Sequence, residues 1–148
     1  MDAMFLSPML DRPEATHQLV NVDRGTRLAT RVEPAFDSAA RRRGLLGRDS
    51  LPAGSAMVIA PSNSVHMFFM RFPLDIVFVA KDGTVVKTCP NVRPWRIASA
   101  WRAFAVVEGG VGMIRKSGTR AGDRIAVEDA PLVEAAFAFS KTAGPPTG

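Results

Sequence analysis

The sequence predicts a mainly β domain, a compact antiparallel β-sandwich or barrel with one principal short helix. Three observations favour this class. Short apolar runs with a period of two recur along the chain, the turn sequence Asp82-Gly83 separates two of them, and only residues 35–46 have a convincing helical pattern. Several short strands at this spacing are typical of sandwiches and barrels.

One domain is expected to account for most of the chain. Its 148 residues suit a single core, and 47% apolar with 22% charged residues are values of a globular protein. This composition excludes a disordered chain, a collagen-like chain and a disulfide framework. Residues 1–16 and 140–148 combine Pro, Gly and Thr without a period, so we expect flexible ends around a single β-rich domain at residues 17–139.

The first elements are expected to be a hairpin and then the helix. Residues 17–22 and 26–32 are rich in Val, Leu and Thr, and the three residues between them suit a hairpin loop. The helix is expected over residues 35–46, after a proline, with apolar side chains on one face and an arginine cluster facing solvent. Gly44 and Gly47 favour its termination.

The rest of the chain changes to the period of strands. The run at residues 74–80 is apolar on both faces and therefore belongs inside a sheet, with Ile76 and Phe78 in the core and Val77 and Val79 buried on the opposite face. Residues 132–139 fit either a strand or a short helix. The other strands are expected over residues 56–60, 65–70, 84–88, 103–107 and 124–127.

Charge and composition limit the partners. The formal net charge is +5, which suits a nucleic acid or an anionic surface, but the arginines are scattered and only residues 41–43 cluster. We therefore expect no specific nucleic-acid binding. One cysteine and two distant histidines predict no disulfide, no metal site and no cofactor.

The beginning of the chain does not have the pattern of a secretory signal. Asp2 is acidic, and Pro8 and Asp11 interrupt a short apolar stretch. No segment approaches the roughly 20 apolar residues that a membrane span needs. We expect a soluble, cytoplasmic protein without a membrane span, unless a leader has been removed.

Three stretches carry a resemblance to a known family. They are Arg41-x-x-Gly44-Leu45-Leu46-x-Arg48-x-x-Leu51 followed by Ala56-Met57-Val58-Ile59, then His66-Met67-Phe68-Phe69-Met70-Arg71-Phe72-Pro73-Leu74-Asp75-Ile76-Val77-Phe78, and finally Val107-Glu108 with Gly112, Gly122 and Asp123. In this order they resemble the bacterial and archaeal domain-of-unknown-function family 192, over about residues 17–128. The resemblance implies a jelly-roll-like antiparallel fold with a short helix, and no reaction. Where the family often has Leu and Pro after the glutamate, this chain has Gly109 and Gly110.

The central stretch contains the first candidate site residues. Alternation places His66 on one face of its strand, and Asp75 begins an otherwise apolar strand. A buried carboxylate needs a partner, and Arg71, Arg48 or backbone amides are the candidates. One interpretation is a structural ion pair. The other is a polar pocket in which His66, Arg71 and Asp75 bind a ligand, or in which His66 is a general base oriented by Asp75.

Three further places in the chain carry polar or reactive groups. Glu108 ends an apolar strand, so it is either the partner of an arginine or a site residue. Cys89 has no flanking signature of a nucleophile and reads as a small buried hydrophobe. Arg93, Trp95 and Arg96 form a basic aromatic loop that either stacks bases or sugars or, as we favour, packs Trp95 under an arginine as a cation–π lid.

Three functions follow from these residues. The first is a binding or accessory protein with a polar cleft for an unidentified small ligand. The second is a small hydrolase- or lyase-like enzyme that uses His66 with Asp75 or Glu108 as acid and base. The third is a weak binder of nucleic acid or an anionic surface through the basic helix and residues 93–96. The sequence leaves enzymatic activity and oligomeric state open. The expected cleft residues are His66, Arg71, Asp75, Arg93, Trp95 and Glu108.

Overall fold

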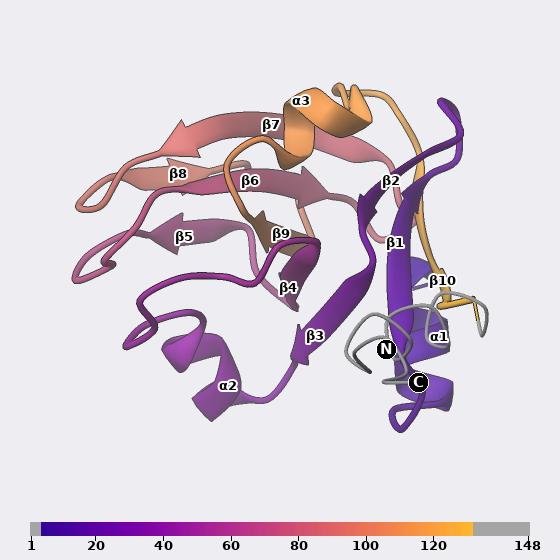
Figure 1. The fold of residues 1–148 in the computed structure, drawn as a ribbon, viewed down its shortest axis with the longest axis horizontal. Coiled ribbons are helices and arrows are strands. Elements are labelled where there is room, and N and C mark those ends of the chain that lie inside the picture. The colour runs from indigo at the N-terminus through magenta and orange to yellow at the C-terminus, as the bar shows by residue number, and fades with distance from the viewer. Residues whose placement is uncertain (1–3, 132–148) are drawn as a thin grey trace, which may run out of the picture.

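The structure, a computed structural model, describes residues 4–131 (Figure 1). The described residues form strands and short helices. The strands are β1 (His17–Asn21), β2 (Thr26–Ala29), β3 (Arg31–Ala35), β4 (Ser55–Ile59), β5 (Ser64–His66), β6 (Leu74–Val79), β7 (Val85–Val92), β8 (Ile97–Ser99), β9 (Ala105–Gly109) and β10 (Ile125–Asp129). The helices are the 3-10 helix η1 (Met4–Leu6) and the α-helices α1 (Ser7–Asp11), α2 (Ser38–Arg43) and α3 (Met113–Ser117). The mainly β class is confirmed.

A five-stranded sheet is the centre of the fold, with the strand order β3-β4-β9-β6-β7. β3 and β4 are parallel, and the other neighbours are antiparallel. A three-stranded sheet, β10-β1-β2, and a two-stranded sheet, β5-β8, complete the arrangement in the described residues. The strands therefore do not close into one barrel, and the parallel pair departs from the predicted antiparallel pattern.

Two hydrophobic cores lie on opposite faces of the five-stranded sheet. On one face, Val77 and Val79 of β6 pack in a cluster with the three-stranded sheet and the N-terminal helices. On the other face, Ile76 and Phe78 pack with Leu45, which follows α2, and with the β5-β8 pair. These four side chains of β6 are completely buried, as a strand with two apolar faces predicts.

The predicted helix at residues 35–46 is shorter than expected. α2 has six residues and is one of three short α-helices in the described part of the chain. It begins after Asp37, whose carboxylate accepts a hydrogen bond from the Ala40 amide, and it ends at Gly44, whose φ is +46°. Pro34 and Ala35 belong to β3, an edge strand of the sheet, where a proline is tolerated.

The two predicted hairpins are present, with differences in detail. β1 pairs with β2 as a hairpin. The predicted strand at residues 26–32 is interrupted at Thr30, and the residues after it form β3, which belongs to the five-stranded sheet. The Asp82-Gly83 turn joins β6 to β7, and Gly83 takes a φ of +93° without a positive φ at Asp82. The expected strand at residues 65–70 is only β5, because a turn follows it.

The described N-terminal residues are not detached from the domain. η1 and α1 place Phe5, Leu6 and Met9 in the first core. The domain limits and the flexible ends at residues 1–16 and 140–148 stay predictions. Residues 132–139, predicted as either a strand or a helix, lie outside the described residues. No helix within residues 4–131 is long and apolar enough to cross a membrane.

Candidate functional site

A cavity of about 300 Å³ lies between α2, β5 and the face of the five-stranded sheet that carries Glu108; we call it the Glu108 cavity. Each of the three stretches that carry the family resemblance contributes to its wall, through α2 and its following loop, through β5 and through β9. The cavity is markedly polar. Its polar wall residues are Ser38, Arg41, Arg42, Arg43, Ser62, Ser64, His66 and Glu108.

Glu108 reaches this cavity because of the strand register. It pairs with Met57 on β4 and with Ile76 on β6, and directly paired residues point to the same face of a sheet. Both neighbours belong to the core beside α2. A Cβ built at Gly44 would lie 3.8 Å from the Glu108 Oε2 atom, so the end of α2 lies close to the carboxyl group.

The Glu108 carboxyl group is buried without a partner. The residue is 6% exposed, and its Oε2 atom has no hydrogen-bond partner in the described part of the chain. Burial raises its pKa from 4.5 to about 7, because the carboxylate loses its hydration when it is shielded from water. Near neutral pH the group therefore exists in both forms, able to donate or to accept a hydrogen bond.

The arginines of α2 form a basic rim on the cavity. Arg41 is held in place, because its guanidinium donates to the Phe36 carbonyl oxygen at 2.6 Å and to Ser38 Oγ at 3.4 Å. Arg42 and Arg43 are exposed, and neither guanidinium makes a hydrogen bond or ion pair within residues 4–131. Two cations at the rim are thus available to a ligand. The cluster was visible in the sequence, but nothing there connected it to Glu108.

His66 and Glu108 share the cavity but do not contact each other. His66 is an exposed residue of β5, and its ring stacks on Phe68 with centroids 5.0 Å apart. No hydrogen bond joins the two side chains in the described structure. A catalytic pair needs atoms within about 3 Å of each other. The structure therefore offers two separate polar groups here rather than an assembled acid–base pair.

Asp75 points to the other face of the sheet. It is 1% exposed, and its carboxylate accepts hydrogen bonds from the amides of Asn91 at 2.9 Å, Gly112 at 3.1 Å and Ile114 at 2.9 Å. These three bonds connect β6 to the end of β7 and to α3. Asp75 does not line the Glu108 cavity, so the structure separates it from His66 and Glu108.

Neither arginine proposed as a partner of Asp75 contacts it. Arg71 instead forms an ion pair with Asp49 at 2.6 Å, and Arg48 forms one with Glu33 at 2.8 Å. Backbone amides, the third candidate, are the partners of the buried carboxylate. Three amide dipoles stabilise a carboxylate without the desolvation of a second charge.

The loop at residues 93–96 differs from the predicted cation–π lid. Trp95 is exposed and packs against Phe69, with ring centroids 4.8 Å apart, rather than under an arginine. The arginine that lies over a tryptophan is Arg102, 4.8 Å from the Trp101 ring. Arg93, like Trp95, is absent from the wall of the Glu108 cavity.

Neither Cys89 nor a cluster of metal-ligating side chains forms a second site in the described residues. Cys89 is half-buried, and burial raises the pKa of its thiol, which disfavours a nucleophilic thiolate. No three His, Cys, Asp or Glu side chains within residues 4–131 are placed to hold a metal ion. A larger hollow of about 550 Å³ between β2 and α3 contains none of the buried, unpartnered polar atoms found in this part of the chain.

Comparisons with known proteins place this fold and sequence among uncharacterised relatives. Residues 19–127 match the sequence profile of the DUF192 family, described as "Uncharacterized ACR". A UPF0127 protein of Pyrococcus abyssi is 28% identical over 113 residues, which are 72% of this chain and 94% of that protein.

Two solved structures are similar. One is of a proposed transcription regulator from Sinorhizobium meliloti, with a TM-score of 0.67 and 25% identity over 76% of this chain and 92% of that chain. The other is of a protein of unknown function from Novosphingobium aromaticivorans, with a TM-score of 0.64 and 27% identity over 74% of this chain and 82% of that chain.

Proposed function

This chain belongs to the DUF192 family of uncharacterised proteins, and from that premise we propose that it binds a small anionic ligand in the Glu108 cavity. The ligand's anionic group, a phosphate or carboxylate, lies against Arg42 and Arg43. A hydroxyl or amine of the same ligand reaches Glu108. A volume of about 300 Å³ is at the lower end of the range for small-molecule sites, so the ligand is a small metabolite.

The observation that carries this proposal is the unpartnered Oε2 atom of Glu108. A buried polar atom without a hydrogen bond costs about 1–3 kcal/mol, and folded proteins retain few such atoms. An apolar residue at this position would avoid that cost. A ligand group that hydrogen-bonds Glu108 removes the cost when it binds, which supports a binding role for the residue.

The charge of the cavity supports an anionic ligand. Arg41, Arg42 and Arg43 line it together with a single carboxyl group, which is about half protonated near neutral pH. Guanidinium groups bind phosphates and carboxylates through charge-assisted hydrogen bonds. The hydroxyl groups of Ser62 and Ser64 offer further hydrogen bonds on the same wall.

Acid–base catalysis by Glu108 is the second candidate function. A carboxyl group with a pKa of about 7 is well matched to proton transfer at neutral pH. His66 lies in the same cavity without contacting Glu108. An enzyme would therefore use Glu108 as a single acid or base, with His66 as a ligand-binding group.

Several finer expectations belong to the same proposal. They are a jelly-roll-like connection of the sheets, a cytoplasmic location and the absence of specific nucleic-acid binding. The last expectation follows from scattered arginines without a recognised base-reading motif.

The test follows the backbone amide shifts of the protein by NMR while glycerol 3-phosphate is added as the probe. Inorganic phosphate and glycerol, the two halves of this molecule, are added in separate experiments. We expect the amides of Gly44 and Ser62 to shift with glycerol 3-phosphate and less with either half. The double substitution Arg42→Ala/Arg43→Ala should weaken the affinity about tenfold or more, because it removes two charge-assisted contacts. Arg115→Ala/Arg120→Ala, which removes two charges outside the cavity, is the matched control and should leave the affinity unchanged.

Two outcomes of the same experiment separate the alternatives. Loss of the probe with time in these samples would support acid–base catalysis, and saturable shifts around the cavity support binding. Absence of shifts around the cavity at millimolar probe, or equal affinity of the double variant, would overturn the proposed site.

A further inference from the structure

Two neighbouring turns at one end of the sheets place aromatic residues in a backbone conformation that favours glycine. In the turn at residues 67–70, the amide of Met70 donates to the Met67 carbonyl oxygen, and the third residue, Phe69, has a φ of +64°. The turn at residues 93–96 repeats this pattern, with Trp95 in third place and a φ of +72°. A positive φ at the third position is the geometry of a type II turn, which selects Gly or Asn.

The two turns are bonded into one unit. The Trp95 amide donates to the Met67 carbonyl oxygen at 2.7 Å, and the Met67 amide donates to the Arg96 carbonyl oxygen at 2.7 Å. The rings of Phe69 and Trp95 are in contact across the turns. We call the surface formed by Phe68, Phe69, Trp95 and Ile97 the aromatic tip.

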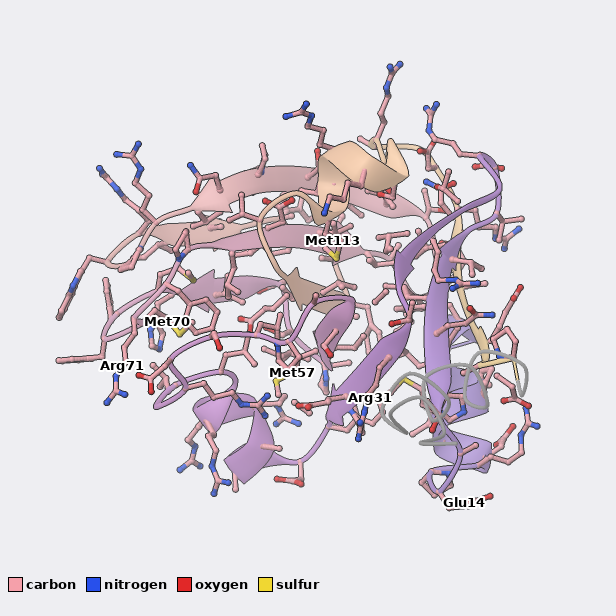
Figure 2. All side chains as sticks on the ribbon, in the orientation of Figure 1. Glu14, Arg31, Met57, Met70, Arg71 and Met113 are labelled. Atoms are coloured by element: carbon pink, nitrogen blue, oxygen red, sulfur yellow. The ribbon has the colours of Figure 1, made fainter. Side chains whose placement is uncertain are left out.

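The aromatic tip is exposed although the core beneath it is already filled. Phe69 is 73% exposed, Trp95 59% and Ile97 67%. Met67 and Met70 of the same turn supply the buried side chains. Figure 1 shows the two loops at the left end of the molecule, and Figure 2 shows Met70 and Arg71 there. Folding therefore does not require the exposed rings, and strain kept at an exposed surface suggests a function.

The charge around the aromatic tip is positive. Arg93 and Arg96 flank Trp95, and their guanidinium groups make no hydrogen bond or ion pair in the described part of the chain. The chain on both sides of the two turns, residues 50–74 and residues 83–107, contains no Asp or Glu. Within the described residues, the carboxylate that forms an ion pair with this part of the chain is that of Asp49, and its partner is the exposed Arg71. The tip is therefore complementary to an anionic partner.

We propose that the aromatic tip docks on an anionic lipid bilayer. The side chains of Phe69, Trp95 and Ile97 enter the headgroup region, while Arg93 and Arg96 contact lipid phosphates. Aromatic residues beside cations are favoured at this interface. We favour a bilayer over a single-stranded nucleic acid, because the exposed surface of the tip includes the aliphatic side chain of Ile97, which offers no face for base stacking.

The test is co-sedimentation with phosphatidylcholine vesicles that contain or lack phosphatidylserine. We expect binding to be at least tenfold stronger with phosphatidylserine. In a Trp101→Phe background, Trp95 fluorescence should shift to the blue on binding. Arg93→Ala/Arg96→Ala should weaken binding about tenfold or more, and Arg115→Ala/Arg120→Ala, with the same loss of charge on another surface, should not.

Glycine substitutions separate docking from folding. Phe69→Gly and Trp95→Gly remove a ring and relieve the positive φ, so each should keep or raise the urea midpoint and weaken vesicle binding about tenfold. Equal sedimentation with both vesicle types, a lower urea midpoint in both glycine variants, or tighter binding to oligothymidylate than to anionic vesicles would each overturn the proposal.

Discussion

The buried carboxyl group of Glu108 should make the stability of this protein depend on pH in a defined direction. Its pKa is about 7 in the folded protein against an ordinary value of 4.5. Between these values the folded state binds more protons than the unfolded state, so the free energy of unfolding falls as the pH rises. One pKa unit is worth about 1.4 kcal/mol, so the fall amounts to about 3 kcal/mol in total.

Glu108→Gln isolates this contribution, because glutamine has a similar shape and cannot ionise. Urea denaturation of both proteins between pH 4 and pH 8 should show a difference that grows with pH. The free energy of unfolding of the variant minus that of the parent should be about 3 kcal/mol larger at pH 8 than at pH 4. Glu128→Gln, at an exposed position of β10, is the matched control and should show no such trend. A difference that stays constant with pH would refute the argument.

Three further substitutions test the fold. Asp75→Asn should lower the free energy of unfolding by about 3 kcal/mol, because one amide oxygen cannot replace a carboxylate that accepts three amide hydrogen bonds, and it should leave probe binding in the Glu108 cavity unchanged. Phe78→Ala should cost about 3–5 kcal/mol, since the ring is completely buried, and an unchanged urea midpoint would contradict this packing. Gly83→Ala should cost at least about 1 kcal/mol, measured by thermal melting, because the new Cβ would lie 2.5 Å from the Ile125 carbonyl oxygen at a φ of +93°. A melting temperature equal to the parent's would contradict that close approach.

The sequence predicted the elements whose signal is local. β6 was recognised because both of its faces are apolar, and the β6–β7 hairpin because Asp82-Gly83 is a strong turn signal. The helix was predicted too long because a good helical pattern does not reveal that Asp37 caps it late or that Ala35 pairs with Ile59 in a sheet. β8 was missed because three residues are too short to show a period.

The candidate site depended on contacts between distant segments. Glu108 and His66 were selected as polar residues in apolar strands, and the structure brings both to one cavity. Nothing local predicted that the arginines of α2 complete that cavity, because the register of β9 against β4 and β6 decides which face Glu108 takes. The same register sends Asp75 to the opposite face, where amides from two distant segments surround it.

The titration of Glu108 itself tests whether this residue is a buried carboxyl group that binds a ligand. The carbon-13 shift of the Glu108 carboxyl can be followed by NMR against pH, with glycerol as the control and then with glycerol 3-phosphate. We expect a midpoint near pH 7 with glycerol, and a displaced midpoint with glycerol 3-phosphate, because the bound anion and the ligand group that reaches Glu108 both change the stability of its carboxylate. A midpoint near the ordinary 4.5 that the probe leaves unchanged would contradict this expectation.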